Sequence, residues 1–140
     1  MWESVIEHRL RRETKVSINQ FGFMPGRCTM EAIFLMRQLM ERYWKKKKDL
    51  HMVFIYLEKA YDRAPRKALW WTLEKKKVAL KYVNAIKDVY DEDTTCVEAC
   101  NETSRHFPIT VGVYQGSALS PYLFALVMDE LTKDIQEEVS

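Results

Sequence analysis

Hydrophobic residues recur at three- and four-residue intervals along most of the chain, a spacing typical of amphipathic helices. Residues 2–13 show this pattern first, and a longer repeat runs from Thr29 to Trp44. Thr29 is a suitable N-cap for this second helix. Its apolar positions define one face that we expect to be buried: Ala32, Ile33, Leu35, Met36, Leu39, Met40 and Tyr43. Two glycines and a proline within residues 19–29 predict a loop between the two helices.

Three further helices are predicted in the remainder of the chain. One begins near Pro65, a residue favoured in a first helical turn, and a second covers Leu80–Asp91. The third begins at a cap-and-first-turn pair, Ser120 and Pro121. The apolar positions of these helices are Leu69, Trp70, Leu73 and Val78; Tyr82, Val83, Ile86, Val89 and Tyr90; and Leu119, Leu123, Val127, Leu131 and Ile135.

Two regions favour strands instead of helices. The short apolar run "LHMVFIYL" (Leu50–Leu57) predicts a strand, and its nearly continuous apolar character favours one covered on both faces. The segments "TTCVEAC" and "RHFPITV" flank the turn-forming "NETS" and predict a hairpin. The fold class expected is therefore α+β, helix-rich, with a small antiparallel sheet.

Composition narrows the class of protein. Hydrophobic residues make up 47% of the 140 residues, and Gly and Pro number four each, which is globular rather than disordered composition. No apolar run approaches the ~20 residues that a membrane-spanning helix needs. The first fifteen residues lack the apolar core of a signal peptide. We therefore expect an intracellular protein, in cytoplasm or nucleus, with its three cysteines as free thiols and no membrane partner.

Charge is distributed unevenly along the chain. Residues 1–50 carry 11 Lys and Arg against 6 Asp and Glu (+5), residues 51–100 carry 9 against 8 (+1), and residues 101–140 carry 2 against 6 (−4). A basic first part is compatible with binding a polyanion such as nucleic acid. The alternative is that the runs "RLRR", "KKKK" and "KKK" are solvated helix ends. Charge alone leaves both interpretations open.

Three stretches, "NQFGFMPGRCTMEAI", "HMVFIYLEKAYDRAP" and "GVYQGSALSPYLFALVMDEL", follow one another along the chain. In order and spacing they resemble the reverse transcriptases of non-LTR (LINE-like) retrotransposons, nearest in type to the RTE group. The resemblance implies a fragment of the right-hand polymerase fold. Residues 1–49 would form part of the fingers and residues 50–140 part of the palm. The thumb and the "FADD" hairpin of the palm would be missing.

The resemblance also implies a metal-dependent reaction, for which one essential side chain has changed. In this family two Mg²⁺ ions, about 3.5–4 Å apart, are held by aspartates and assist nucleotide transfer. One aspartate belongs to the motif F-x-D-L-x-K-A-F/Y-D, which here reads "FIYLEKAYD" and places Tyr56 at its position. A phenol, with a pKa of about 10, is a poor Mg²⁺ ligand. Glu58 and Asp62, without a third group, make a weak metal site. We expect neither bound Mg²⁺ nor polymerase activity from this chain.

The resemblance assigns other roles residue by residue. Tyr61 corresponds to the aromatic residue that excludes a 2′-hydroxyl, although a core tyrosine has the same sequence signature. The backbone of Leu57, Glu58, Lys59 and Ala60 would face the triphosphate. Gln115 and Gly116 would lie beside the incoming nucleotide, or simply form a helix-entry loop. Arg27 would contact the template strand, or be an ordinary surface arginine.

Three functions follow from these expectations. The first is a reverse transcriptase fragment that has lost its activity, whose family partners are an RNA template, a DNA primer and a deoxynucleoside triphosphate. The second is a nucleic-acid-binding module without catalysis. The third is a helical interaction protein or a retroelement relic with no function. A separate expectation is that the chain exposes apolar surface at Trp70, Trp71 or Leu123, and an unpaired strand edge.

Overall fold

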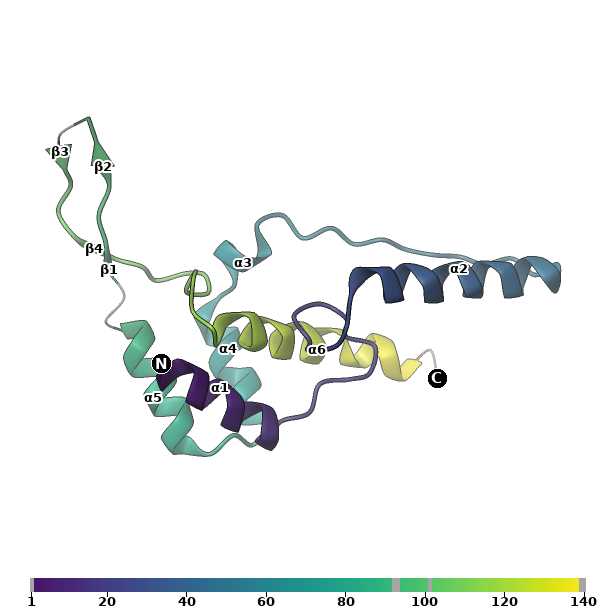
Figure 1. The fold of residues 1–140 in the computed structure, drawn as a ribbon, viewed down its shortest axis with the longest axis horizontal. Coiled ribbons are helices and arrows are strands. Elements are labelled where there is room, and N and C mark those ends of the chain that lie inside the picture. Colours follow the sequence, from purple (N-terminus) through teal and green to yellow (C-terminus); the bar gives the residue numbers. More distant parts are fainter. Residues whose placement is uncertain (1, 92–93, 101, 139–140) are drawn as a thin grey trace.

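The computed structural model describes residues 2–91, 94–100 and 102–138. Within these ranges the chain forms six helices and four very short strands (Figure 1). Their bounds are α1 Trp2–Glu13, α2 Thr29–Lys45, α3 Ala60–Arg63, α4 Arg66–Lys75, α5 Leu80–Asp91, β1 Thr94–Thr95, β2 Glu98–Ala99, β3 Glu102–Thr103, β4 Phe107–Pro108 and α6 Ser120–Glu138. The helices predicted from hydrophobic spacing are all present. None of the described helices is both long enough and apolar enough to cross a membrane.

Four helices, α1, α4, α5 and α6, pack together around one apolar core. The buried faces predicted for α4 and α5 are confirmed, and so is the first half of the face predicted for α6. Leu131 and Ile135, in its second half, are exposed instead, because α6 extends beyond the helices that cover its beginning (Figure 1). The largest fully buried side chains are Leu10, Leu69, Leu73, Ile86, Tyr90, Leu119, Tyr122, Leu123 and Leu126.

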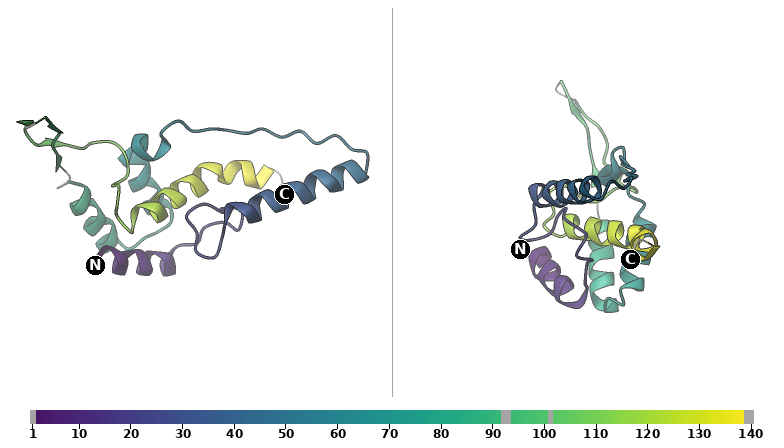
Figure 2. Two further views of the ribbon diagram at one scale, coloured as in Figure 1. Left: turned by 45° about the horizontal axis from the view of Figure 1, so that its top comes forward. Right: turned by 90° about the vertical axis from the view of Figure 1, so that its right-hand side faces the viewer.

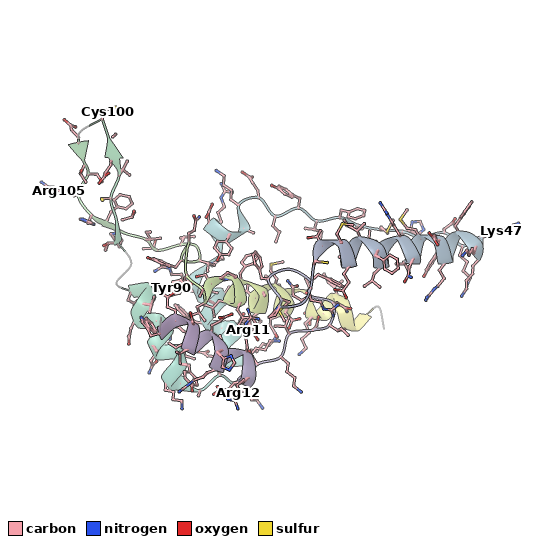
Figure 3. All side chains as sticks on the ribbon, viewed as in Figure 1. Arg11, Arg12, Lys47, Tyr90, Cys100 and Arg105 are labelled. Atoms are coloured by element: carbon pink, nitrogen blue, oxygen red, sulfur yellow. The ribbon has the colours of Figure 1, made fainter. Side chains whose placement is uncertain are left out.

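Helix α2 forms where it was predicted but is not packed as predicted. It extends away from the four-helix core, with Lys47 just beyond its outer end (Figures 2 and 3). None of its residues is buried, so the expectation of a buried face is wrong. The N-cap is Cys28, in extended conformation and without a side-chain cap bond, rather than Thr29. Helical spacing determines which residues share a face, but whether a partner covers that face depends on the rest of the fold.

The predicted strand at Leu50–Leu57 is also wrong. Residues 51–57 form an extended segment between α2 and α3, and all seven are exposed (Figure 1). In the part of the chain that the structure describes, the segment pairs with no other strand. A strand needs a neighbour to satisfy its backbone groups, and the strands of the hairpin pair only with each other. Much of the exposed apolar surface lies on this segment and α2, whereas Leu123 is buried and only Trp71 of the two tryptophans is exposed.

The predicted hairpin is confirmed, with a shifted turn. Strands β1 and β4 pair antiparallel through Thr94↔Pro108 and Thr95↔Phe107. Strands β2 and β3 pair through Glu98↔Thr103 and Ala99↔Glu102, so Glu102 and Thr103 of the predicted turn belong to a strand. The hairpin projects from the end of α5 (Figure 1). The observed fold is thus helix-rich with small antiparallel sheets.

A buried carboxylate fastens the segment after α1 to the core. One oxygen of Asp129, on α6, accepts a hydrogen bond from the backbone N–H of Ser17 at 2.8 Å. The other accepts one from the Lys76 ammonium at 2.7 Å, and that ammonium also donates to the Lys15 carbonyl at 3.1 Å. Burial by itself raises the pKa of Asp129, but the hydrogen bonds from Lys76 and Ser17 outweigh it and hold the pKa below its ordinary value.

Candidate functional site

Two segments about fifty residues apart in the sequence meet at α3. The backbone N–H of Gly112 donates to the Ala64 carbonyl, and that of Val113 donates to the Tyr61 carbonyl, each at 3.0 Å. The Gln115 side-chain amide donates a further hydrogen bond to the Asp62 carboxylate. The second and third of the three stretches quoted above are therefore joined by backbone and side-chain hydrogen bonds.

Gly112 permits this close approach. Its φ of +91° lies in the left-handed region, and an added Cβ would lie 2.5 Å from the backbone oxygen of Asp62. Gly116 has a similar φ of +86°, but a Cβ there would meet nothing within 4 Å. Only the first of these two glycines is therefore required for both its conformation and its packing.

We predict that Gly112→Ala destabilises the chain more than Gly116→Ala. Both substitutions incur the conformational cost of about 1–2 kcal/mol for a left-handed non-glycine residue. Gly112→Ala adds a backbone clash, which should bring its total to about 3 kcal/mol. Urea unfolding followed by circular dichroism measures both variants. Equal losses of unfolding free energy would show that the segment is not held against α3.

A cavity of ≈450 Å³ opens beside this junction. Polar groups from both joined segments and from strand β1 line it, which suits a ligand that offers hydrogen-bond donors and acceptors. Its lining residues are Asp62, Thr94, Thr95, Ile109, Val111, Gly112, Val113, Tyr114 and Gln115.

The side chain of Tyr61 is half-buried in an aromatic cluster behind the junction. Its ring centroid lies 5.4 Å from that of Phe124 on α6 and 6.2 Å from that of Phe23 in the loop before α2. Burial raises the pKa of Tyr61, so the phenol is neutral at physiological pH. This cluster links the loop, α3 and α6, and it fixes the direction in which Tyr61 leaves the backbone.

Tyr90, on α5, supports the junction through a hydrogen bond to the segment around Tyr114, a role that its sequence position does not reveal. It is fully buried, its hydroxyl lies 3.3 Å from Ser120 Oγ, and it accepts a hydrogen bond from the backbone N–H of Tyr114 at 3.4 Å. Ser120 is thus the first residue of α6 and a partner of Tyr90, rather than an N-cap. Ser117 Oγ instead accepts the N–H of Leu119 at the helix entrance.

The residues before Tyr61 are outside the cavity. Tyr56 is 90% exposed on the unpaired extended segment and does not line the cavity. Leu57, Glu58 and Lys59 are exposed as well, and Ala60 is half-buried at the start of α3. Of the predicted nucleotide-contacting residues, Tyr61 accepts a hydrogen bond from the Val113 N–H and Gln115 donates one to the neighbouring Asp62, while Gly116 is exposed beside Gln115.

The side chains present at this site do not fit Mg²⁺. Within the described residues, no three His, Cys, Asp or Glu side chains are grouped so that they could hold a metal ion. Asp62 accepts the Gln115 amide, Glu58 is exposed, and the side chain at position 56 is a phenol. Mg²⁺ binds through carboxylate oxygens. Among the described side chains at this site, no set of carboxylate oxygens converges on one point.

Arg27 is engaged within its own loop. Its guanidinium pairs with Glu31, donates to the Ile18 carbonyl at 2.7 Å and lies 4.8 Å from the centre of the Phe21 ring. It does not line the cavity at α3. The side chain of Arg27 therefore holds together the loop that carries Phe23.

Comparison with known proteins identifies relatives along the whole chain. Residues 1–140 match the family described as reverse transcriptase (RNA-dependent DNA polymerase). The chain is 26% identical over 133 residues to the Retrovirus-related Pol polyprotein from type-1 retrotransposable element R2 of Nasonia vitripennis, covering 95% of the chain and 13% of that protein. It is 24% identical over 136 residues to the R2DM polyprotein of Drosophila melanogaster, covering 97% and 13%.

A third relative carries a more explicit name. The chain is 27% identical over 135 residues to the Probable RNA-directed DNA polymerase from transposon BS of Drosophila melanogaster, covering 94% of the chain and 15% of that protein. The chain thus spans 13–15% of the length of these three relatives. Because the family match extends over every residue, this chain belongs to the reverse transcriptase family and is similar to the reverse transcriptases of non-LTR retrotransposons.

Proposed function

We propose that the chain forms part of the fingers, about residues 1–49, and part of the palm, about residues 50–140, of a right-hand RNA-directed DNA polymerase. The observation that carries this proposal is the junction at α3. There, hydrogen bonds from Gly112, Val113 and Gln115 join the segment around Tyr61 to the segment that leads into α6. A polymerase palm has to bring these two segments together around an incoming nucleotide.

In this proposal the ligands are those of a template-directed polymerase. Gln115 and Gly116 lie beside the incoming deoxynucleoside triphosphate, and the Tyr61 ring excludes a 2′-hydroxyl. The backbone of residues 57–60 faces the triphosphate. Arg27 acts on the RNA template through the loop that it fastens, and a DNA primer completes the complex. The cavity beside Gln115, with its mixed polar lining, is compatible with a nucleotide base or sugar.

The proposed domain does not catalyse nucleotide addition as it stands. Tyr56 occupies the position of a metal-binding aspartate, and a phenol offers Mg²⁺ no carboxylate oxygen. The described carboxylates do not converge on a metal position either. In this proposal the chain binds nucleic acid and nucleotide without catalysing nucleotide addition.

A segment exchange tests this function. Residues 2–138 replace the matching segment of the BS protein, which supplies the rest of the polymerase. We expect the chimera to bind an RNA template annealed to a DNA primer but to add no nucleotide to the primer. Binding is read by gel shift and extension by denaturing electrophoresis. Extension by the unaltered chimera would contradict the proposed loss of catalysis, and loss of template–primer binding by a folded chimera would contradict the polymerase assignment.

Nucleic-acid binding without any polymerase partner is the second candidate function. The observation that favours it is the cluster of exposed cations at the outer end of α2, Lys45–Lys48, next to Trp44, which is 82% exposed. Exposed aromatic rings among cations can stack on unpaired bases. Binding of single-stranded RNA by the isolated chain, lost on replacing all four lysines by glutamine, would support this function.

A further inference from the structure

A second polar cavity lies far from α3, between the end of α1 and the start of α5. It measures ≈420 Å³ and is lined by Arg9, Arg12, Glu13 and Tyr82. The two helices lie side by side on the other side of α6 from α3 (Figures 1 and 2). Neither the cavity nor its residues take part in the junction described above.

The hydroxyl of Tyr82 is held in this cavity as a hydrogen-bond donor. A terminal nitrogen of Arg9 donates to the phenol oxygen at 3.4 Å. The hydrogen of the Tyr82 hydroxyl is therefore left free to donate to a ligand. The same contact with Arg9 lowers the pKa of Tyr82, which makes its hydroxyl a stronger donor. The Lys81 ammonium lies 4.8 Å from the centre of the Tyr82 ring and adds a third cation.

The charges around the cavity are not balanced by neighbouring carboxylates. Arg11, on the same helix, is neutralised by Glu7 at 2.7 Å and lies over the Tyr122 ring. Among the described residues, by contrast, Arg12 forms no ion pair, and its side chain points to the outer edge of the molecule (Figure 3). The residues that line the cavity carry two cations, Arg9 and Arg12, against one carboxylate, that of Glu13, which is a net charge of 2 − 1 = +1. Lys81, beside the Tyr82 ring, adds a further cation next to the cavity.

We propose that this cavity binds the phosphodiester backbone of a single-stranded RNA. Guanidinium groups match the oxygens of a phosphate with paired N–H donors, and the Tyr82 hydroxyl supplies a further donor. The volume admits one phosphate with its attached sugars rather than a folded protein element. That the phosphate belongs to RNA rests on the proposed function. The site would hold the strand outside the α3 junction and lengthen the contact between chain and template.

Salt dependence of RNA binding tests the site. The double variant Arg9→Gln/Arg12→Gln is compared with the unaltered chain by fluorescence anisotropy of a labelled single-stranded RNA between 50 and 200 mM salt. Each lost phosphate contact lowers the slope of log K against log salt by about 0.7, so two contacts lower it by about 1.4. Affinity at the lowest salt should fall about tenfold. Both arginines are exposed, so the variant should melt like the unaltered chain.

The matched control removes two exposed cations elsewhere. Lys67→Gln/Arg105→Gln has the same net charge as the test variant, but the proposal predicts a slope within about 0.3 of the unaltered chain's. Glu13→Gln removes the repulsion between one exposed carboxylate and the RNA phosphate. It should therefore strengthen binding two- to threefold. A gain of affinity cannot come from misfolding.

Four outcomes would overturn the proposal. Equal losses in the test and control variants would show a general charge effect, with no defined site. RNA binding that does not change in Arg9→Gln/Arg12→Gln would remove the site but leave the proposed function standing. Displacement of RNA by inorganic phosphate beyond that caused by chloride at equal ionic strength would assign the cavity to a free phosphate. Failure of the unaltered chain to bind RNA at all would remove both the site and the nucleic-acid partner of the proposed function.

Discussion

Tyr56→Asp is expected to give the BS chimera primer-extension activity that the unaltered chimera lacks. The substitution returns a carboxylate to the extended segment just before α3. There it can hold a metal ion together with the palm residues that the BS protein supplies. A metal ion contributes several kcal/mol to the stabilisation of transferring phosphoryl oxygens. Since each 1.36 kcal/mol changes a rate about tenfold, the gain should be at least about a thousandfold. Extension of a labelled primer on an RNA template measures it.

The control for this prediction is Tyr56→Asn in the same chimera. Asparagine removes the ring but adds no negative charge, so it should leave the chimera inactive. Activity in both variants would mean that the ring blocks the site by its size, and that the missing charge is not the cause. Inactivity of a folded, template-binding Tyr56→Asp chimera would mean that other changes in the chain have also abolished catalysis.

The second large effect is expected from Asp129, whose carboxylate joins α6, α4 and the segment after α1. In Asp129→Ala the Lys76 ammonium, with a side chain only 18% exposed, loses its closest partner. Breaking such a pair from one side costs about 3 kcal/mol, because the remaining charge is left poorly solvated. Urea unfolding measures the loss. The double variant Asp129→Ala/Lys76→Met should recover part of it, and a double variant that loses the sum of both single losses would show that the pair is not coupled.

The same carboxylate makes the stability of the folded chain depend on pH. The pKa of Asp129 is lower in the folded chain than in the unfolded chain, so its contribution is present above the unfolded pKa of about 3.9 and lost as the pH falls through the folded value. Glu130, whose pKa is lowered by Lys75, adds a contribution of the same sign. Below about pH 5 the unaltered chain should therefore lose more unfolding free energy than Asp129→Asn does. Parallel pH profiles for the two would exclude this role.

The helices could be predicted from the sequence because their signals are local. Positions such as Val83, Ile86 and Tyr90 identify a buried face from spacing alone. The strand predicted at residues 50–57 does not form, because an apolar run becomes a strand only when another segment supplies hydrogen bonds. The same reasoning applies to α2, whose apolar face is periodic but is covered by no described element.

The candidate site was predicted only in part, for a related reason. The two stretches around Tyr61 and Gln115 were recognisable as motifs, and the structure joins them. The requirement for Gly112 was not, since it arises from a backbone oxygen fifty residues away. The buried bond between Asp129 and Ser17 likewise spans 112 residues of sequence. Contacts of this kind depend on packing and leave no local pattern.

Photochemical crosslinking tests the central claim most directly. A deoxynucleoside triphosphate with a photoreactive base is bound to the chimera with its template and primer, irradiated, and the modified peptides are identified by mass spectrometry. The polymerase assignment predicts crosslinks within residues 57–63 and 112–116, the two segments that meet at α3. Crosslinks confined to α2 or to the hairpin, with none at α3, would contradict it.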